Sequence, residues 1–171
     1  VHGAQKALGA QFGLNYGWEH PLYYAADVPD SAGYARQPWW DVVGREARML
    51  RGREGIIDLS NFAKYRVAGP GAERWLNALF PNAMPRDVGR SCLTPLIGRR
   101  GGVAGDFTVT RLGPEEFWVL GSGAAERYHQ RFFREVPLPP DTVFESLTER
   151  VCGFNVAGPR ARDLLSRLTD A

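Results

Sequence analysis

The spacing of hydrophobic residues predicts three helices along this chain. Apolar residues between Asp41 and Arg53 recur with the period of an amphipathic helix, and Gly55 follows in a position typical of a helix end. The stretch from Gly71 to Leu79 again gathers apolar residues on one helical face, and Pro70 suits its first turn. A third helical pattern runs from about Ala124 to Glu135.

Other stretches alternate between apolar and polar residues, which predicts strands. A short apolar segment at residues 56–59 comes first, and Gly113-Pro114 marks a turn between two later strands. The remaining strand candidates are residues 64–68, 92–97, 103–112, 116–120 and 151–156. Strands and helices in this order, without a regular βα repeat, indicate an α+β fold.

Residues 1–40 differ from the rest, because they are rich in aromatic residues, proline and glycine. This composition predicts an irregular N-terminal arm whose rings pack on another part of the protein. We expect residues 41–145 to form the first half of a domain and residues 146–171 to begin a second half. The chain starts with Val1 instead of Met, so we also expect it to be cut from a longer protein.

A repeat supports the division into halves. The segment Val67 to Leu79 recurs 89 positions later as Val156 to Leu168, with Val-Ala-Gly-Pro, an Ala and two Leu at the same spacing. We therefore expect two matching strand–turn–helix units related by an approximate two-fold axis. The second unit ends soon after its helix, so the apolar face at Leu165 and Leu168 must pack on the first half, pair with another chain, or stay partly exposed.

Composition excludes several classes of protein. The net charge of +2 is too small for a nucleic-acid-binding footprint, and no apolar run reaches the roughly 18 residues that a membrane helix needs. Cys92 and Cys152 lie far apart, without a Cys-x-x-Cys pair or a histidine cluster, which argues against a metal site. Two free cysteines suit a cytoplasmic protein, and the excess of Arg over Lys is typical of a GC-rich bacterial genome.

The strongest candidate for chemistry is Asp106, which follows a double glycine and begins the apolar run Phe107-Thr108-Val109. Asp is disfavoured in strands, and a carboxylate between Gly105 and Phe107 is expected to be partly desolvated and suited to proton transfer. From these residues alone, a turn-capping Asp paired with Arg99 or Arg100 is the more common explanation.

A resemblance to a known family changes this balance. Residues Thr94 to Val109 resemble the Thr-Pro-(Met/Leu)-x-Asn-x-x-Gly-Gly-x-x-x-Asp-(Leu/Phe)-x-Val signature of the aminomethyltransferase family. Tyr16 to Leu22 is similar to the family's opening Gly-Trp-Glu-x-Pro element, and Gly55 to Tyr65 is similar to a stretch of its dehydrogenase branch. The family includes the glycine cleavage T-protein and the C-terminal halves of dimethylglycine and sarcosine dehydrogenases. The chain departs from the signature at Gly98, where the family usually has Asn.

The resemblance implies that the chain binds tetrahydrofolate, which accepts a one-carbon unit from an iminium or aminomethyl donor to give 5,10-methylenetetrahydrofolate. It implies that Asp106 is the catalytic carboxylate, beside the folate N10. The candidate folate-binding residues that it suggests are Leu96, Gly101, Gly102, Ser122 and Tyr65. For Tyr65 the alternative is core packing, and for Arg99-Arg100 the alternatives are a contact with the glutamate tail of folate or solvated surface.

The dehydrogenase branch is the favoured relative, because of the aromatic spacer from Asp27 to Trp40 and the stretch from Ser60 to Tyr65. The amine substrate would then be a small methylated amine, and FAD would bind only in a separate upstream domain.

The alternatives are a stand-alone T-protein, a tetrahydrofolate-dependent demethylase, or a non-catalytic folate-binding module. The Gly121-Ser122-Gly123 turn resembles a dinucleotide loop but lacks its third glycine. We expect the isolated chain to be inactive and to bind no flavin or metal.

Overall fold

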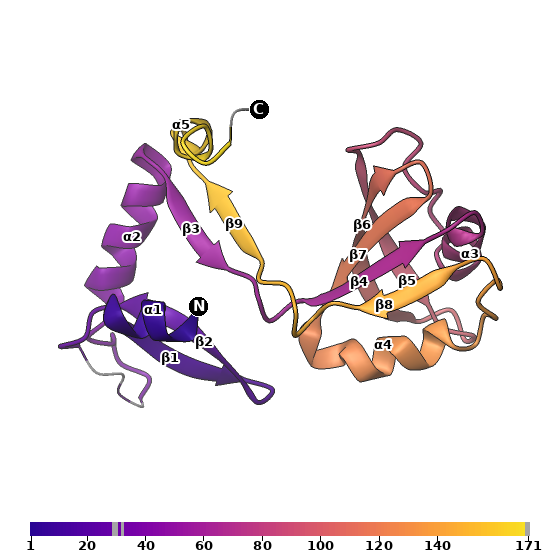
Figure 1. The fold of residues 1–171 in the computed structure, drawn as a ribbon. Coiled ribbons are helices and arrows are strands. Elements are labelled where there is room, and N and C mark those ends of the chain that lie inside the picture. The colour runs from indigo at the N-terminus through magenta and orange to yellow at the C-terminus, as the bar shows by residue number, and fades with distance from the viewer. Residues whose placement is uncertain (29–30, 32, 170–171) are drawn as a thin grey trace. The chain divides into compact units, whose positions relative to one another are not determined.

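A computed structural model describes residues 1–28, 31 and 33–169 of the chain. The chain forms two compact units (Figure 1), which we call the terminal unit, Val1–Leu59 with Cys152–Ala171, and the central unit, Ser60–Val151. The grouping differs from the expected boundaries at residues 40 and 145, because the N-terminal segment shares its unit with the C-terminal residues.

The terminal unit combines two small antiparallel sheets with three helices. One sheet pairs β1 with β2, and the other pairs β3 with β9, two strands that the whole central unit separates in the sequence. Its elements are α1 (His2–Ala7), β1 (Ala10–Asn15), β2 (Trp18–Tyr24), α2 (Trp40–Gly52), β3 (Gly55–Asp58), β9 (Phe154–Ala157) and α5 (Ala161–Leu165).

The prediction of an irregular N-terminal arm was wrong. The segment forms a hairpin in which Asn15 pairs with Trp18 across a two-residue loop. Both loop residues, Tyr16 and Gly17, have positive φ, as the twist of a tight hairpin requires. The aromatic rings also pack within the arm itself, since Tyr23 on β2 is buried and stacks on Trp39 at 6.1 Å between ring centroids.

The central unit is built on one five-stranded antiparallel sheet with the order β5-β6-β7-β4-β8 (Figure 1). Two longer helices and a short 3₁₀ turn, η1, accompany it. Its elements are β4 (Ala63–Ala68), α3 (Ala72–Leu79), β5 (Ser91–Ile97), β6 (Val103–Gly113), β7 (Glu116–Gly121), η1 (Gly123–Ala125), α4 (Glu126–Phe133) and β8 (Val143–Ser146).

Strand β8 was not predicted from the sequence. It is only four residues long and follows a proline-rich stretch at residues 137–140, which resembles a linker. Its pairing partner is β4, with Val67 opposite Phe144, so the strand depends on residues far away in the sequence. Helix α4 also begins later than expected, because residues 123–125 form the η1 turn.

The hydrophobic core lies on one face of this sheet. Helices α3 and α4 both contribute to it, through Trp75 and Phe133 among others, so both cover the same face. The Trp75 indole Nε1 also donates a hydrogen bond of 3.0 Å to the carbonyl of Val136, which fixes the segment after α4. The fully or nearly fully buried strand residues are Ala63, Tyr65, Val67, Phe107, Val109, Phe117 and Val119.

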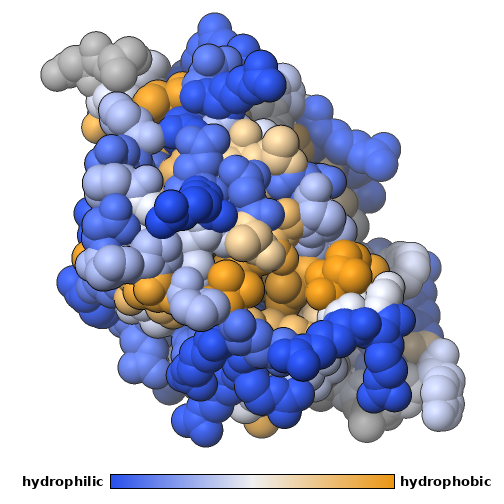
Figure 2. Space-filling model, turned by 90° about the vertical axis from the view of Figure 1, so that its right-hand side faces the viewer, coloured by the Kyte–Doolittle hydropathy of each residue, from blue (hydrophilic) through white to orange (hydrophobic). Residues whose placement is uncertain are grey.

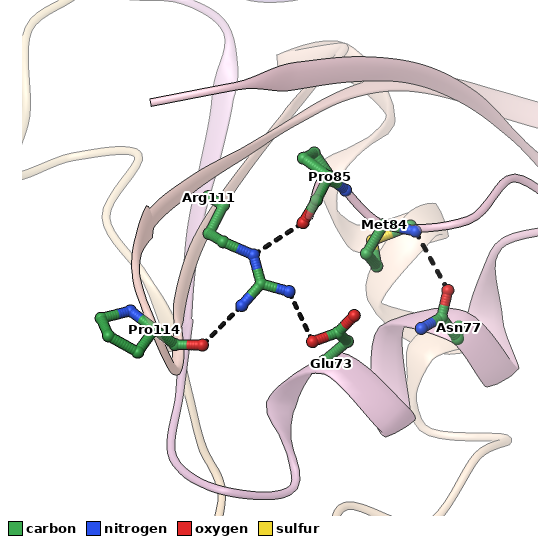
Figure 3. A network of polar contacts seen from close by, with 6 residues as sticks. All are labelled: Glu73, Asn77, Met84, Pro85, Arg111 and Pro114. Carbon is green, nitrogen blue, oxygen red and sulfur yellow. Dashed lines mark hydrogen bonds and ion pairs between the residues drawn. The ribbon is translucent and has the colours of Figure 1, made fainter. Parts of the chain in front are cut away.

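A buried arginine ties the loop after α3 to the sheet (Figure 3). Arg111 is 6% exposed, and its guanidinium donates to the carbonyls of Pro85, at 2.6 Å, and Pro114, at 2.5 Å, and to the Glu73 carboxylate of α3. It also lies over the Phe117 ring, 4.4 Å from the centroid. The planar guanidinium of Arg111 donates to all three acceptors at once, and this holds the loop against the strand ends.

The two copies of the sequence repeat have the same local geometry. Gly69 and Gly158 both have positive φ, at 119° and 108°, and each carbonyl accepts a hydrogen bond from the amide three residues later. A side chain at either glycine would also collide with a backbone carbonyl. The helices that follow differ, because α3 buries four residues and α5 buries none, with Leu168 78% exposed. Association through this second helix stays a prediction.

Candidate functional site

The second face of the five-stranded sheet carries polar and apolar side chains that the core does not use, and we call it the open face. Alternation along β6 sends Phe107 and Val109 into the core and Asp106 and Thr108 to the open face. Leu93 on β5, the partner of Thr108, is 74% exposed there. Figure 2, which views the molecule from the right-hand side of Figure 1, shows hydrophobic side chains among polar ones on that side.

Asp106 lies on the open face and is exposed. It pairs with Pro95 of β5, and it follows a bulge between β5 and β6 that shifts the register at Leu96 and Ile97. The expectation of a partly desolvated carboxylate was therefore wrong for this chain, because Gly105 and Phe107 on either side point to the core face. Neither arginine of the hairpin loop pairs with it among the residues described, so the turn-capping explanation does not apply.

Ser122 comes directly after β7 and is also exposed. The glycines on both sides pack tightly: a side chain at Gly121 would collide with the Phe107 ring, and one at Gly123 would collide with the Asn61 carbonyl. The pairing of β6 with β7 sets Thr108 opposite Leu120, so its continuation by one pair on the same face leads to Asp106 and Ser122. Asp106 and Ser122 therefore lie at the same end of the β6–β7 pair, with Ser122 just beyond the end of β7.

Gly101 and Gly102 form the tip of the β5–β6 hairpin. Gly101 has a φ of 78°, and its amide donates to the Gly98 carbonyl at 2.8 Å, while the Gly98 amide donates to the Gly102 carbonyl at 2.8 Å. Nothing lies within 4 Å of a side chain built at either Gly101 or Gly102. The double glycine therefore makes the turn, and its position leaves the tip accessible.

Two predicted folate contacts lie in the core instead. Tyr65 is 0% exposed and packs edge-on against Phe133, with its hydroxyl donating to the Glu126 carbonyl at 3.4 Å. Leu96 is also buried in the core cluster. Burial leaves neither side chain accessible to a ligand on the open face, so the alternative of core packing describes Tyr65, and Leu96 shares its environment.

His129 lies beneath Asp106, on the core side of β6. It is buried against the Phe107 ring at 4.6 Å, and its Nε2 fills the space beside Gly105. Burial lowers the pKa of His129, and the carboxylates of Asp106 and Glu126 oppose this shift with a smaller effect. A neutral imidazole is therefore favoured at this buried position.

Sequence reasoning missed two polar residues that fasten other parts of the central unit. Glu126, in the first turn of α4, accepts hydrogen bonds from the hydroxyls of Ser146 and Thr148 at 2.6 and 3.1 Å, which fastens the β8 region. Lys64 is 2% exposed, and its ammonium donates to the carbonyls of Ser60 and Phe62. The signal in the sequence was a charge at the start of a helix and a charge inside an alternating strand.

Other kinds of site are not found in the part of the chain that the structure describes. No group of three or more His, Cys, Asp or Glu side chains could hold a metal ion there. Within the same residues, no helix has the length and apolar character to cross a membrane. Cys92 and Cys152 are free thiols, and burial raises the pKa of Cys92.

Comparison with known proteins gives the family. The model of the GCVT N-terminal domain matches residues 1–171, the whole chain. The chain belongs to the GCVT N-terminal domain family. This confirms the resemblance to aminomethyltransferases on which the sequence interpretation rested.

Relatives of this GCVT domain include enzymes of both branches considered. Mitochondrial dimethylglycine dehydrogenase of Mus musculus is 30% identical over 99% of the chain, and the chain spans 20% of that protein. The aminomethyltransferase of Saccharopolyspora erythraea is also 30% identical over 99% of the chain, which spans 42% of it. The GCVT domain thus spans a fifth to two fifths of these two relatives.

Solved structures confirm the fold of the GCVT domain. The glycine cleavage system aminomethyltransferase T of Bartonella henselae superimposes with a TM-score of 0.80 at 23% identity, covering 97% of this chain and 42% of the other. At this identity the likeness concerns the fold alone. The α+β class and the aminomethyltransferase-type fold are therefore as predicted.

Proposed function

We infer that the open face of the central unit binds tetrahydrofolate and that Asp106 takes part in the transfer of a one-carbon unit to it. The observation that carries this inference is an exposed carboxylate on β6, near the accessible glycine hairpin and at the same end of the β6–β7 pair as Ser122. Membership of the GCVT N-terminal domain family and similarity to aminomethyltransferases support the choice of folate as acceptor.

The residues of the open face fit a flat, partly polar substrate. Pro95 and Leu93 offer apolar surface on β5, while Asp106 and Ser122 offer an acceptor and a hydroxyl that can donate or accept. Arg66 and Glu116 pair at 2.8 Å on the same face, and the hydrogen bond from Arg66 lowers the pKa of the Glu116 carboxyl. Asp106, the one acidic residue of β6, has no ion pair with the residues that the structure describes.

The role of Asp106 follows from its charge. As a folate nitrogen attacks an iminium or aminomethyl donor, it loses a proton, which a carboxylate beside it accepts. The same negative charge stabilises a cationic donor by electrostatic attraction, and this attraction strengthens when the site excludes water. The carbon becomes bonded to both folate nitrogens while its bond to the donor amine breaks, and the amine leaves with the protons that the two nitrogens lose. The product is 5,10-methylenetetrahydrofolate, and the donor is the iminium that prior oxidation of a small methylated amine supplies.

Similarity to dimethylglycine dehydrogenase supports a place for this domain in a demethylating enzyme of that kind. In such a protein FAD would bind in a separate upstream domain and oxidise the methylated amine to its iminium, while this chain would bind tetrahydrofolate. Similarity of the same degree to an aminomethyltransferase keeps a glycine cleavage T-protein as the alternative.

The test is made in the full-length protein of which we expect this chain to be a part, because we expect the isolated chain to be inactive. The substitution Asp106→Asn keeps the shape of the side chain and removes its charge and basicity. We expect the rate of methylenetetrahydrofolate formation to fall by about 10²- to 10⁴-fold, while tetrahydrofolate affinity changes much less. Asp87→Asn is a matched control, because Asp87 is an exposed carboxylate in the loop before β5. Wild-type transfer rates in Asp106→Asn, or an equal loss in Asp87→Asn, would contradict the proposal.

One relative favours a second candidate. The mitochondrial pyruvate dehydrogenase phosphatase regulatory subunit of Mus musculus is 29% identical over 96% of the chain, and its name describes a regulatory protein. A non-catalytic folate-binding module is therefore the second candidate for this chain. It predicts that tetrahydrofolate binds while neither the wild type nor Asp106→Asn forms methylenetetrahydrofolate.

A further inference from the structure

A pocket of about 220 Å³ lies within the terminal unit, where the chain after α2 meets the start of α5. Helix α2 leads into β3, and α5 follows β9, so the pairing of these two strands brings the two segments together (Figure 1). The residues that line the pocket are Arg53, Glu54, Arg160, Asp163, Leu164 and Arg167. The site proposed for folate transfer uses none of them.

The sequence repeat gives this pocket a counterpart in the central unit. Strands β3 and β9 pair in the same register as β8 and β4, with Ile56 opposite Val156 and Phe144 opposite Val67. Gly158 and Gly69 also approach equivalent backbone carbonyls, those of Arg53 and Asp141. The two copies of the repeat can therefore be compared position by position.

The comparison shows that side chains fill this corner in the central unit. Gly71 is buried there, and a side chain at its position would collide with Asp141 and Thr142. The corresponding positions of the terminal unit carry larger charged residues, namely Arg160, Arg53 and Glu54. The backbone arrangement is shared, and the replacements turn a filled corner into a pocket lined by charges.

The pocket presents both signs of charge. Three arginines and two carboxylates line it. Arg53 Nη2 lies 3.7 Å from Glu54 Oε1, which is too long for a hydrogen bond. Among residues 1–28, 31 and 33–169, Arg160, Asp163 and Arg167 form no ion pair. Positive and negative groups are therefore both available to a ligand.

Glu54 has the most specific environment of the lining residues. Its side chain is 28% exposed, yet its Oε2 atom is buried and accepts no hydrogen bond from a described residue. A buried carboxylate oxygen without a donor is unfavourable, and an N–H group of a ligand would remove this cost. A cationic donor suits it best, because hydrogen bonds between charged groups are the stronger ones.

We propose that this pocket binds a small zwitterionic amino acid, with its carboxylate between Arg160 and Arg167 and its ammonium group at Glu54. Guanidinium groups bind a carboxylate with paired hydrogen bonds, and partly buried Leu164 offers an apolar contact beside them. Pockets for drug-sized ligands measure roughly 300–1,000 Å³, so this smaller one suits a ligand of few heavy atoms. The site is independent of folate binding.

The first arm of the test titrates the isotope-labelled whole chain with glycine and follows the amide chemical shifts of Arg160 and Leu164. We expect saturable shifts at both. Acetate and methylammonium each carry one of the two charges and should bind about tenfold more weakly than glycine. Trimethylglycine keeps both charges but has no N–H group for Glu54, so its affinity should fall by a similar factor.

Each alternative gives a different result in the same titrations. No saturable shift with glycine would overturn the site. Equal affinities for glycine and acetate would describe a site for simple anions and overturn the zwitterion. Equal affinities for glycine and trimethylglycine would overturn the role of Glu54 as the acceptor. These comparisons use the wild type alone, so they do not depend on how a variant folds.

The second arm assigns the ligand to the pocket. Glu54→Gln should weaken glycine binding by about tenfold and leave acetate binding unchanged, whereas Arg160→Gln should weaken both. Arg162→Gln is the matched control, because Arg162 is an exposed arginine of α5 outside the pocket. Full glycine affinity in both pocket variants, or an equal loss in the control, would overturn the assignment. Asp106→Asn should bind glycine as the wild type does, and a loss there would place glycine at the folate site instead.

Discussion

The core face and the open face of the five-stranded sheet receive alternate residues of the same strand. On β6, Phe107 and Val109 point to the core face and are 1% and 0% exposed, whereas Asp106 lies on the open face and is exposed. A residue's neighbour in sequence therefore lies in a different environment, with a different role. The core face determines stability, and the open face carries the site that we propose for folate.

Among substitutions that compare the two faces, we expect Phe107→Ala to change the free energy of unfolding most. The Phe107 ring contacts His129 and Phe80, with ring centroids 4.6 and 5.2 Å apart, and its removal leaves a cavity in the core. We expect the free energy of unfolding to fall by about 3–5 kcal/mol, measured by denaturant titration. Thr108→Ala, one residue along on the open face, should change it by less than about 1 kcal/mol. Equal losses would show that both faces are structural.

The second effect concerns the arginine on the core side of the same strand. Arg111→Lys keeps a charge but cannot reach the carbonyls of Pro85 and Pro114 and the Glu73 carboxylate together. We expect a loss of about 2–3 kcal/mol in unfolding free energy, and earlier proteolysis in the loop at residues 80–90. Arg90→Lys, at an exposed position of that loop, should have no measurable effect. A loss no larger than that of the control would refute the anchoring role.

The third effect is a dependence of stability on pH at His129. Burial lowers its pKa in the folded state, so the unfolded state binds the proton first as the pH falls below about 6.5. The stability contributed by the neutral imidazole is complete above that pH and decreases towards the lower folded-state pKa. The slope is at most about 1.4 kcal/mol per pH unit.

His129→Gln should remove this part of the slope below about pH 6.5, when unfolding free energies are compared with those of the wild type. His2→Gln serves as the control, because the His2 side chain is about half exposed. A wild-type slope that persists unchanged in His129→Gln would assign the pH dependence to other groups.

Periodicity predicted most of the central unit because its strands alternate strictly between the core and the open face. The predicted strands 64–68, 92–97 and 103–112 correspond to β4, β5 and β6 within one residue at each end. Helix α3 was found for the same reason, since it buries Ala72, Trp75, Leu76 and Leu79 on one side. A pattern imposed by a single buried face is visible in the sequence alone.

The elements that were missed depend on partners that are distant in the sequence or on turn conformation. Strand β8 exists because β4 pairs with it, and the N-terminal hairpin depends on positive φ at Tyr16, a residue that rarely adopts it. The three-donor role of Arg111 also requires Pro85 and Glu73 to be brought together by the fold. None of these contacts follows from the spacing of hydrophobic residues.

For the candidate site, the resemblance supplied residue types but not the face on which they lie. It selected Asp106 and Ser122, which are accessible on the open face, together with Tyr65 and Leu96, which the core encloses. Alternation along β4 and β5 would have placed Tyr65 and Leu96 in the core if the side of each strand that faces the core had been assigned first. The folate roles of the accessible residues stay predictions.

The most direct test of the account is a titration of methyl-labelled chain with monoglutamyl tetrahydrofolate, followed by the methyl chemical shifts of Thr108 and Val109. These neighbours on β6 report on the open face and the core face of the sheet. If the open face binds folate, the Thr108 methyl shifts with saturation and the Val109 methyls stay near their free positions. A saturable shift at Val109 without one at Thr108, or no shift at either, would contradict the assignment of folate binding to the open face.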